Sequence, residues 1–192
     1  MARKVWKRKK GADLNVKLSD VHHFKNKNVE CYFRDLETHL IQFIQESDSV
    51  LVCVAWLTSQ PVLKAIVERP SVIILRNESW LNKKGGVAKK SRDMYESKTT
   101  SKNTMLVSGQ TIKENLLVCG CISHPQNMHH KFVVRLDTKG NPVSVWTGSF
   151  NPTTNGNESL ENGIVIHNKQ LAEAYTQEFL QVHKISKTLK FA

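Results

Sequence analysis

Two histidines and a lysine stand directly before a run of residues with strand character, in the stretch NMHHKFVVRLD over residues 127–137. Alternate side chains of a strand share a face, so His129 and Lys131 point to one side, while His130 and Phe132 point to the other. His129 and Lys131 therefore form the pair that can act together. We expect His130 to lie in the core or directly behind the reactive pair.

Small polar residues end the next predicted strand, in the segment PVSVWTGSFN over residues 142–151. Ser149 and Asn151 share one face there, and the turn TKGN between the two strands predicts a hairpin. This hairpin would bring a hydroxyl and an amide near His129 and Lys131. Such a set suits an anionic tetrahedral group, because Lys131 and Asn151 can hold phosphate oxygens while the imidazole attacks or transfers a proton.

Strand and helix patterns alternate along the chain and predict an α/β fold in a single domain, since 192 residues are too few for two comfortable cores. The apolar run at 49–57 predicts a strand buried on both faces, and residues 58–68 predict a helix with Ser59 as its N-cap. The other predicted strands fall at 28–33, 71–76, 104–109, 115–123, 130–137, 142–150 and 162–168, and the other predicted helices at 34–47 and 169–186.

The net charge of +11 at pH 7 favours polyanionic partners, nucleic acid first. Six of the first ten residues are Lys or Arg, so residues 1–28 predict a basic arm ahead of a catalytic domain at 29–192. A polar stretch at about 77–103 lacks an apolar face and predicts a long basic loop inserted into that domain. The residues expected to contact nucleic-acid phosphates are Lys83, Lys84, Lys89, Lys90 and Arg92.

The sequence gives no sign of a membrane location. No apolar run approaches the roughly 18 residues that span a bilayer, and no apolar segment of a secretory signal follows the basic start. We therefore expect a cytoplasmic protein with no membrane partner. Trp56 and Trp146 lie in apolar strand patterns and are expected in the core, whereas His22 and His23 are expected to be exposed.

The segments MHHKFVVRLD and VWTGSFNPTTNGNESLENGIVI together resemble the phospholipase D superfamily, through its His-x-Lys signature, Gly-Ser-x-Asn turn and downstream Glu-Asn pair. The likeness is greatest to small one-motif bacterial nucleases and to the nuclease domains of some metal-independent restriction enzymes, and it covers roughly residues 29–183. His-x-Lys alone would be weak evidence, and the combination is specific. The resemblance implies a mixed β-sheet flanked by helices on both faces.

The family's catalytic positions fall on His129, Lys131, Ser149, Asn151 and Glu161. The resemblance implies that His129 is a nucleophile that forms a covalent phosphohistidine, while Lys131 and Asn151 bind the phosphate. Glu161 matches the acid that orients the histidine, and a carboxylate on one ring nitrogen does leave the other nitrogen free. Glu158 competes for this role, although the sequence SLEN favours Glu161.

The family's aspartate is displaced in this chain. It normally follows the lysine after four intervening residues, a position held here by Leu136, and Asp137 comes one residue later. A β-bulge would restore its placement. Otherwise the role of this aspartate is missing.

The combined signature, His-x-Lys followed by Gly-Ser-x-Asn, occurs once in this chain. In this the chain resembles one-motif relatives that form two-fold homodimers, with the two motifs facing each other across the seam. One histidine then attacks while the other, protonated, donates to the leaving oxygen, which predicts a bell-shaped pH profile. The resemblance implies no metal and no other cofactor. The expected function is that of a metal-independent endonuclease-like hydrolase acting on DNA more readily than RNA, with a separate specificity subunit supplying any strong sequence preference.

Three alternatives stay open at this point. Cys119, Cys121 and His124, with His129 or His130, would offer zinc ligands, but their spacing is unlike common zinc modules and would consume the catalytic histidine. A phospholipid phosphodiesterase would need an apolar rim for docking, where this chain has basic polar loops. A catalytically inactive nucleic-acid-binding module would not need the full set of catalytic residue types.

Overall fold

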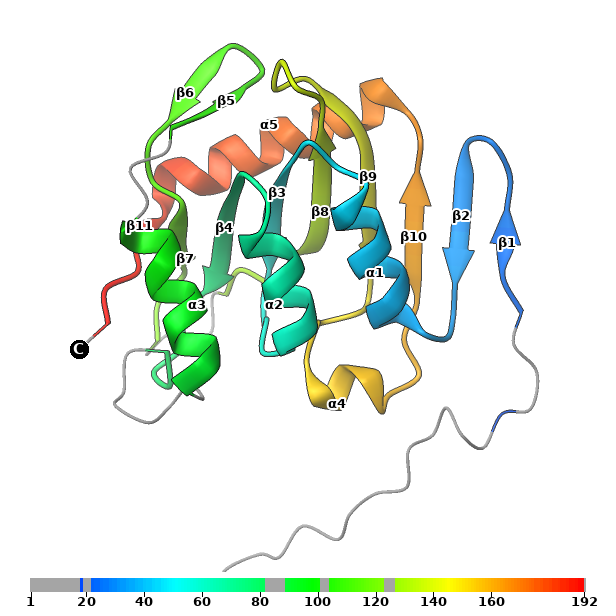
Figure 1. The fold of residues 1–192 in the computed structure, drawn as a ribbon, viewed down its shortest axis with the longest axis horizontal. Helices are drawn as coiled ribbons and strands as arrows, with labels where there is room; N and C mark the ends of the chain where they lie inside the picture. The colour runs from blue at the N-terminus through cyan, green and yellow to red at the C-terminus, as the bar shows by residue number, and fades with distance from the viewer. Residues whose placement is uncertain (1–17, 19–21, 82–88, 101–103, 123–126, 192) are drawn as a thin grey trace, which may run out of the picture.

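The computed structural model describes residues 18, 22–81, 89–100, 104–122 and 127–191 (Figure 1). Within these ranges, one mixed sheet has the strand order β1-β2-β10-β9-β8-β3-β4-β7-β11. Its strands are β1 Phe24–Lys25, β2 Val29–Tyr32, β3 Ser49–Val54, β4 Ser71–Arg76, β7 Leu116–Cys119, β8 Lys131–Leu136, β9 Pro142–Gly148, β10 Gly163–Ile166 and β11 Lys187–Thr188. A separate hairpin joins β5 Met105–Val107 to β6 Gln110–Ile112.

Helices cover both faces of the sheet, which confirms the predicted architecture (Figure 1). The helices are α1 Leu36–Gln45, α2 Gln60–Val67, α3 Lys89–Thr100, α4 Thr154–Asn157 and α5 Lys169–Ile185. Helices α1, α2 and α3 pack on one face, and α5 packs on the other. None of the helices in the described ranges is both long and apolar enough to cross a bilayer.

Strand β3 lies at the centre of the sheet and is buried on both faces, as its continuous apolar run predicts. Its Val50, Val52 and Val54 side chains join the core under α1 and α2, while Leu51 and Cys53 join the core under α5. Helix α2 follows with the predicted cap, because the hydroxyl of Ser59 accepts from the backbone N–H of Val62 at 3.2 Å. These contacts fix the carboxyl end of β3.

The polar region predicted as a loop at about 77–103 contains helix α3, so that expectation was wrong for residues 89–100. The inward side of α3 carries Ser91, Tyr95 and Lys98, all buried and all capable of hydrogen bonding. The Tyr95 hydroxyl donates to the carbonyl of Leu57, and Lys98 Nζ donates to the carbonyl of Arg69 at 2.8 Å. The helix therefore docks through polar contacts, which a search for an apolar stripe overlooks.

Several strand ends meet along one edge of the sheet. Strands β3 and β4 are parallel, so their carboxyl ends lie together, and antiparallel β8 begins at the same edge with Lys131 opposite Val54. Strand β9 ends there with Gly148, which pairs with Gly163 at the start of β10. Ligand sites in α/β folds form where loops leave such an edge. In this chain, the loops that leave it carry the residues singled out by the sequence.

Candidate active site

His129 and Lys131 lie where the chain enters β8. The backbone N–H of Ala55 donates to the carbonyl of His130 at 2.9 Å, which ties this segment to the end of β3. Lys131 Nζ lies 3.0 Å from His129 Nδ1 and donates to the His129 carbonyl at 2.8 Å. The imidazole of His129 stands edge-on to the indole of Trp56, with ring centroids 5.4 Å apart and an interplanar angle of 86°. The His129 ring is thus packed against the Trp56 side chain.

The neighbouring His130 points to the opposite side, as the strand alternation predicts. Its Nε2 lies 3.0 Å from Oε1 of Glu178 on α5, and its ring packs edge-on against Phe132. The expectation that His130 lies in the core was wrong, because its side chain is exposed beside α5. The two adjacent histidines therefore have different environments, and only His129 contacts Lys131.

The surroundings of His129 favour its neutral form. Burial lowers the pKa of His129 below its usual 6.5, and the positive charges of Lys131 and Arg76 lower this pKa further. Burial also lowers the pKa of Lys131, and the carboxylate of Glu161 opposes that shift. A neutral imidazole keeps a lone pair on one ring nitrogen, so this histidine is suited to act as a nucleophile or a base.

Ser149 joins the end of β9 to the loop that precedes β10. Its backbone N–H donates to the carbonyl of Asn162 at 3.1 Å, its Oγ accepts from the N–H of Asn162, and its hydroxyl donates to Oε2 of Glu161. Gly148 permits this approach, since a Cβ atom at that position would collide with the carbonyl oxygen of Asn162. The hydroxyl of Ser149 therefore fixes the Glu161 carboxylate in place.

The negative charge of Glu161 acts on Lys131, and the Glu161 carboxylate accepts a hydrogen bond from Ser149. The resemblance implied that Glu161 orients His129, whereas the polar side chain within hydrogen-bond distance of the His129 ring is Lys131. The competing Glu158 ends helix α4 and is exposed. Of the two acids, Glu161 is the one that lies by Lys131.

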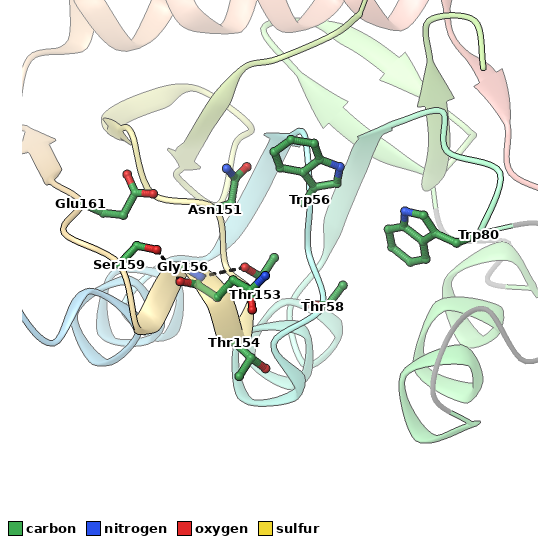
Figure 2. Close-up of a pocket in the computed structure, with 10 residues that line it drawn as sticks. Trp56, Thr58, Trp80, Asn151, Thr153, Thr154, Gly156, Ser159 and Glu161 are labelled. Carbon is green, nitrogen blue, oxygen red and sulfur yellow. Dashed lines mark hydrogen bonds between the residues drawn. The ribbon is translucent and has the colours of Figure 1, made fainter. Parts of the chain in front are cut away.

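A pocket of about 510 Å³ opens beside these residues (Figure 2). Trp56 lines this pocket and also contacts the ring of His129, so the pocket lies next to the His129 site. The lining residues are Trp56, Thr58, Trp80, Asn151, Thr153, Thr154, Asn155, Gly156, Ser159 and Glu161.

Sequence reasoning missed the two tryptophans of this pocket. Trp56 was expected in the core, but it is only partly buried and contacts His129, while Trp146 is buried as expected. The position of Trp56 just after the fully buried strand β3 was the available signal that it lies in a site, because sites form at strand ends. Trp80 follows β4 in an irregular segment, and no local pattern marked it.

The chain matches the family model described as "Cardiolipin synthase, PLD-like domain" over residues 40–183, which contain all five predicted catalytic residues. The chain belongs to the phospholipase D-like family. It is also 31% identical over 203 residues to "Uncharacterized protein L381" of Acanthamoeba polyphaga mimivirus, an alignment that covers 92% of this chain and 72% of that protein.

Solved structures share this phospholipase D-like fold. Nuc from Salmonella typhimurium, a phospholipase D family member, superposes with a TM-score of 0.57 at 17% identity, covering 84% of this chain and 97% of Nuc. NucT from Helicobacter pylori gives a TM-score of 0.59 at 13% identity, covering 84% and 98%. Phosphatidylserine synthase of Haemophilus influenzae gives 0.54 at 16% identity, covering 86% of this chain and 41% of the synthase. These likenesses show the fold.

The displaced aspartate of this phospholipase D-like chain belongs to a turn. Asp137 accepts hydrogen bonds from the backbone N–H groups of Lys139 at 2.9 Å and Asn141 at 2.8 Å, closing the hairpin between β8 and β9. Hydrogen bonds from Asn141 lower the pKa of Asp137. A register shift does occur beside Asp137, between Arg135 and Leu136. It lies at the carboxyl end of β8, however, whereas Lys131 lies at the amino end of this strand. Asp137 thus shapes the hairpin.

The basic residues predicted to bind nucleic acid are only partly described. Lys83 and Lys84 lie outside the described residues, whereas Lys89 and Lys90 are exposed on α3. Arg92 forms an ion pair with Glu96 at 2.7 Å, and its guanidinium lies 5.2 Å from the centre of the Phe191 ring. On α3, Lys89 and Lys90 therefore offer the more accessible positive charges.

Among the described residues, no group of three or more His, Cys, Asp or Glu side chains is arranged to hold a metal ion. Of the zinc ligands considered from the sequence, Cys119 is buried, Cys121 is exposed, and His124 lies outside the described ranges. His129 instead contacts Lys131 and Trp56.

Proposed function

We propose that this chain is a phosphodiesterase that cleaves nucleic acid, DNA more readily than RNA, with His129 as its nucleophile. The observation that carries the proposal is the contact between the His129 ring and the Lys131 ammonium, beside the pocket lined by Asn151 and Glu161. A nucleophile with a depressed pKa next to a cation is what attack on an anionic phosphodiester requires.

The proposed reaction has two displacements. A ring nitrogen of His129 attacks phosphorus, so an N–P bond forms as the bond to the leaving oxygen breaks, and Lys131 and Asn151 hold the other phosphate oxygens. The leaving oxygen takes a proton from an acid. Water then attacks phosphorus, gives its proton to the group that served as the acid, and releases His129. The proposal includes no metal and no other cofactor.

We propose that a second copy of this chain supplies the acid. His-x-Lys followed by the Gly-Ser-x-Asn turn occurs once in the chain, so a two-fold homodimer would place a second His129, in protonated form, across the phosphate. Two such histidines titrate as a coupled pair. A separate specificity subunit would account for any strong sequence preference of the complex.

Nucleic acid is the favoured substrate because of charge. The chain carries a net charge of +11, and Lys89 and Lys90 are exposed on helix α3. Phosphate neutralisation by such lysines supplies sequence-independent affinity. The basic arm predicted at 1–28, together with Lys83 and Lys84, would add to it.

The deciding experiment compares wild type, His129→Ala and His130→Ala on labelled single- and double-stranded DNA and on RNA, with excess EDTA. We expect cleavage in EDTA by wild type and by His130→Ala, and at least a 10³-fold loss in His129→Ala. His130→Ala is the matched control, since it removes the adjacent imidazole that faces α5.

Two further arms test the rest of the proposal. Acid quench of the reaction should trap labelled phosphate on the protein, and light scattering should show a dimer. Activity that requires added divalent metal would contradict the mechanism, and a fully active monomer would contradict the two-histidine scheme. Turnover of phospholipid vesicles in place of nucleic acid would establish a lipid phosphodiesterase instead.

A further inference from the structure

We infer that the pocket beside His129 is a subsite for an unpaired nucleobase, with Trp80 as its stacking surface. The inference rests on the proposed function and deepens it, because it names single-stranded nucleic acid as the substrate class. The pocket takes two tryptophans from the loops after β3 and β4, and neutral polar residues from the chain between β9 and β10 (Figure 2).

The aromatic side of the pocket is built as one unit. The indole N–H of Trp56 donates to Oε1 of Glu78 at 3.0 Å, and Arg76 forms an ion pair with the same oxygen at 2.9 Å. Glu78 opens the tight turn that presents Trp80, because its carbonyl accepts from the N–H of Leu81 at 3.1 Å. Leu81 is buried and anchors the turn in the core. Trp80 is thus held in a fixed relation to Trp56.

Trp56 is already occupied by protein groups, which leaves stacking to Trp80. His129 meets the Trp56 ring edge-on, and the Arg76 guanidinium lies 5.3 Å from the centre of the same ring. Trp80 is partly exposed and lines the pocket on the side of Trp56 away from Asn151 and Glu161 (Figure 2). A base stacked on Trp80 would therefore flank the phosphate bound at Lys131 without displacing the catalytic pair.

The opposite wall offers hydrogen-bonding groups without charge. It comes from α4 and the residues around it, where the hydroxyl of Thr153 caps the helix by accepting from the N–H of Gly156 at 3.0 Å. Thr154 and Asn155 are exposed toward solvent at this wall. Neutral amides and hydroxyls suit the edges of a nucleobase, which carry donors and acceptors but no charge.

Charge and size both favour a base over a charged headgroup. Among the lining residues Glu161 is the one that carries a charge, and it is hydrogen-bonded to Ser149. The volume of about 510 Å³ lies within the range of small-ligand pockets, roughly 300–1,000 Å³. A base that is paired and stacked inside a duplex cannot enter such a pocket, so the subsite selects single strands or flipped nucleotides.

The test measures binding to the His129→Ala protein, so that cleavage does not interfere. Fluorescence anisotropy would compare a short single-stranded DNA with the same strand carrying one abasic residue at each position in turn. We expect Trp80→Ala to weaken binding of the intact strand by about 5- to 100-fold, because a stacked base contributes roughly 1–3 kcal/mol. The strand whose abasic residue falls at the Trp80 subsite should bind equally to the His129→Ala protein and to the His129→Ala/Trp80→Ala protein.

Trp80→Phe is the matched control, because it keeps an aromatic face and should retain most of the affinity. Circular dichroism must show that each variant is folded, as Trp80 also packs against the core. Equal weakening of intact and abasic strands by Trp80→Ala, or no weakening of either, would overturn the inference. If Trp80→Ala abolished binding to anionic phospholipid vesicles and left DNA binding unchanged, this result would overturn the inference in favour of a lipid site.

Failure of the inference and failure of the proposed function give different results. If the wild type cleaves single strands and duplexes equally and Trp80→Ala changes neither, the base subsite is refuted and the phosphodiesterase stands. If the wild type cleaves no nucleic acid while binding to the intact strand still depends on Trp80, the catalytic proposal is refuted and the subsite stands.

Discussion

A histidine can attack phosphorus only while one ring nitrogen carries a lone pair. Desolvation of His129 and its contact with Lys131 both disfavour the imidazolium, so the reactive form persists at pH values where an ordinary imidazole is already protonated. In the proposed mechanism, the lysine that neutralises the phosphate would therefore also keep the nucleophile unprotonated. This dual use requires Lys131 to touch both the ring and the substrate.

The pKa of His129 should depend on the Lys131 charge in a definite direction. We expect Lys131→Met to raise this pKa, because a positive charge that opposed protonation is removed, while burial still keeps the pKa below 6.5. The measurement is an NMR pH titration of the His129 ring. Lys184→Met, which removes an exposed charge at the end of α5, should leave the titration unchanged. An unmoved His129 in the Lys131 variant would show that the lysine acts only on substrate.

At the scale of residues, the sequence predicted that His129 and Lys131 lie together, but it did not predict the side chains around them. The placing of His129 and Lys131 on one face follows from strand alternation, which needs no tertiary information. Trp80 could not be found in the same way, because its role depends on a turn that packs beside a strand pair distant in the chain. The contact between Ser149 and Glu161 was also beyond sequence reasoning, since it depends on the close approach of two loops.

At the scale of elements, Glu30 of β2 links β1 to the residue that follows β10. Its carboxylate accepts from the hydroxyl of Tyr32 and lies 3.1 Å from Lys25 Nζ and 2.9 Å from His167 Nε2. Burial alone would raise the pKa of Glu30, but the hydrogen bonds from Tyr32, His167 and Lys25 prevail and lower it to about 2. One carboxylate thus connects these segments far from the candidate active site.

Glu30 should make the stability of the protein pH-dependent. Since its folded pKa lies below the ordinary 4.5, the stabilisation is complete above pH 4.5 and is lost as the pH falls toward 2. We expect Glu30→Gln to lower the free energy of unfolding by about 1–3 kcal/mol near pH 7, with a smaller difference below pH 4.5. Urea unfolding followed by circular dichroism measures this. Glu68→Gln, at an exposed ion pair with Lys64, should cost less than about 0.5 kcal/mol. Equal effects would refute the role of Glu30.

Element prediction succeeded where apolar residues fill the inner face and failed where they do not. The buried runs of β3 and β4 and the amphipathic α5 were placed to within a few residues. Helix α3 was missed because its buried stripe consists of Ser91, Tyr95 and Lys98. Tyr95 and Lys98 of this stripe donate to carbonyl groups of distant segments, a condition that no local pattern reveals.

At the scale of the whole molecule, the proposed function predicts that positive charge controls the encounter with nucleic acid. The double variant Lys89→Glu/Lys90→Glu should weaken binding to single-stranded DNA and reduce the slope of log affinity against log salt by about 2, because each lost phosphate contact removes roughly one released counterion. The control variant Lys184→Glu/Lys187→Glu makes the same change in net charge, at the carboxyl end of α5 and in β11. An identical loss in both variants would mean that net charge alone, and not the α3 surface, governs binding.

The central position of β3 also governs when this protein can become active. Strand β3 pairs with β8, whose residues lie about 80 positions later in the chain, and the pocket is completed only by Glu161. Contacts between such distant segments form slowly. A chain emerging from the ribosome therefore exposes His129 and Lys131 before β9 and β10 exist to complete their surroundings. Synthesis itself would thus delay the proposed nucleolytic activity until the whole sheet has closed.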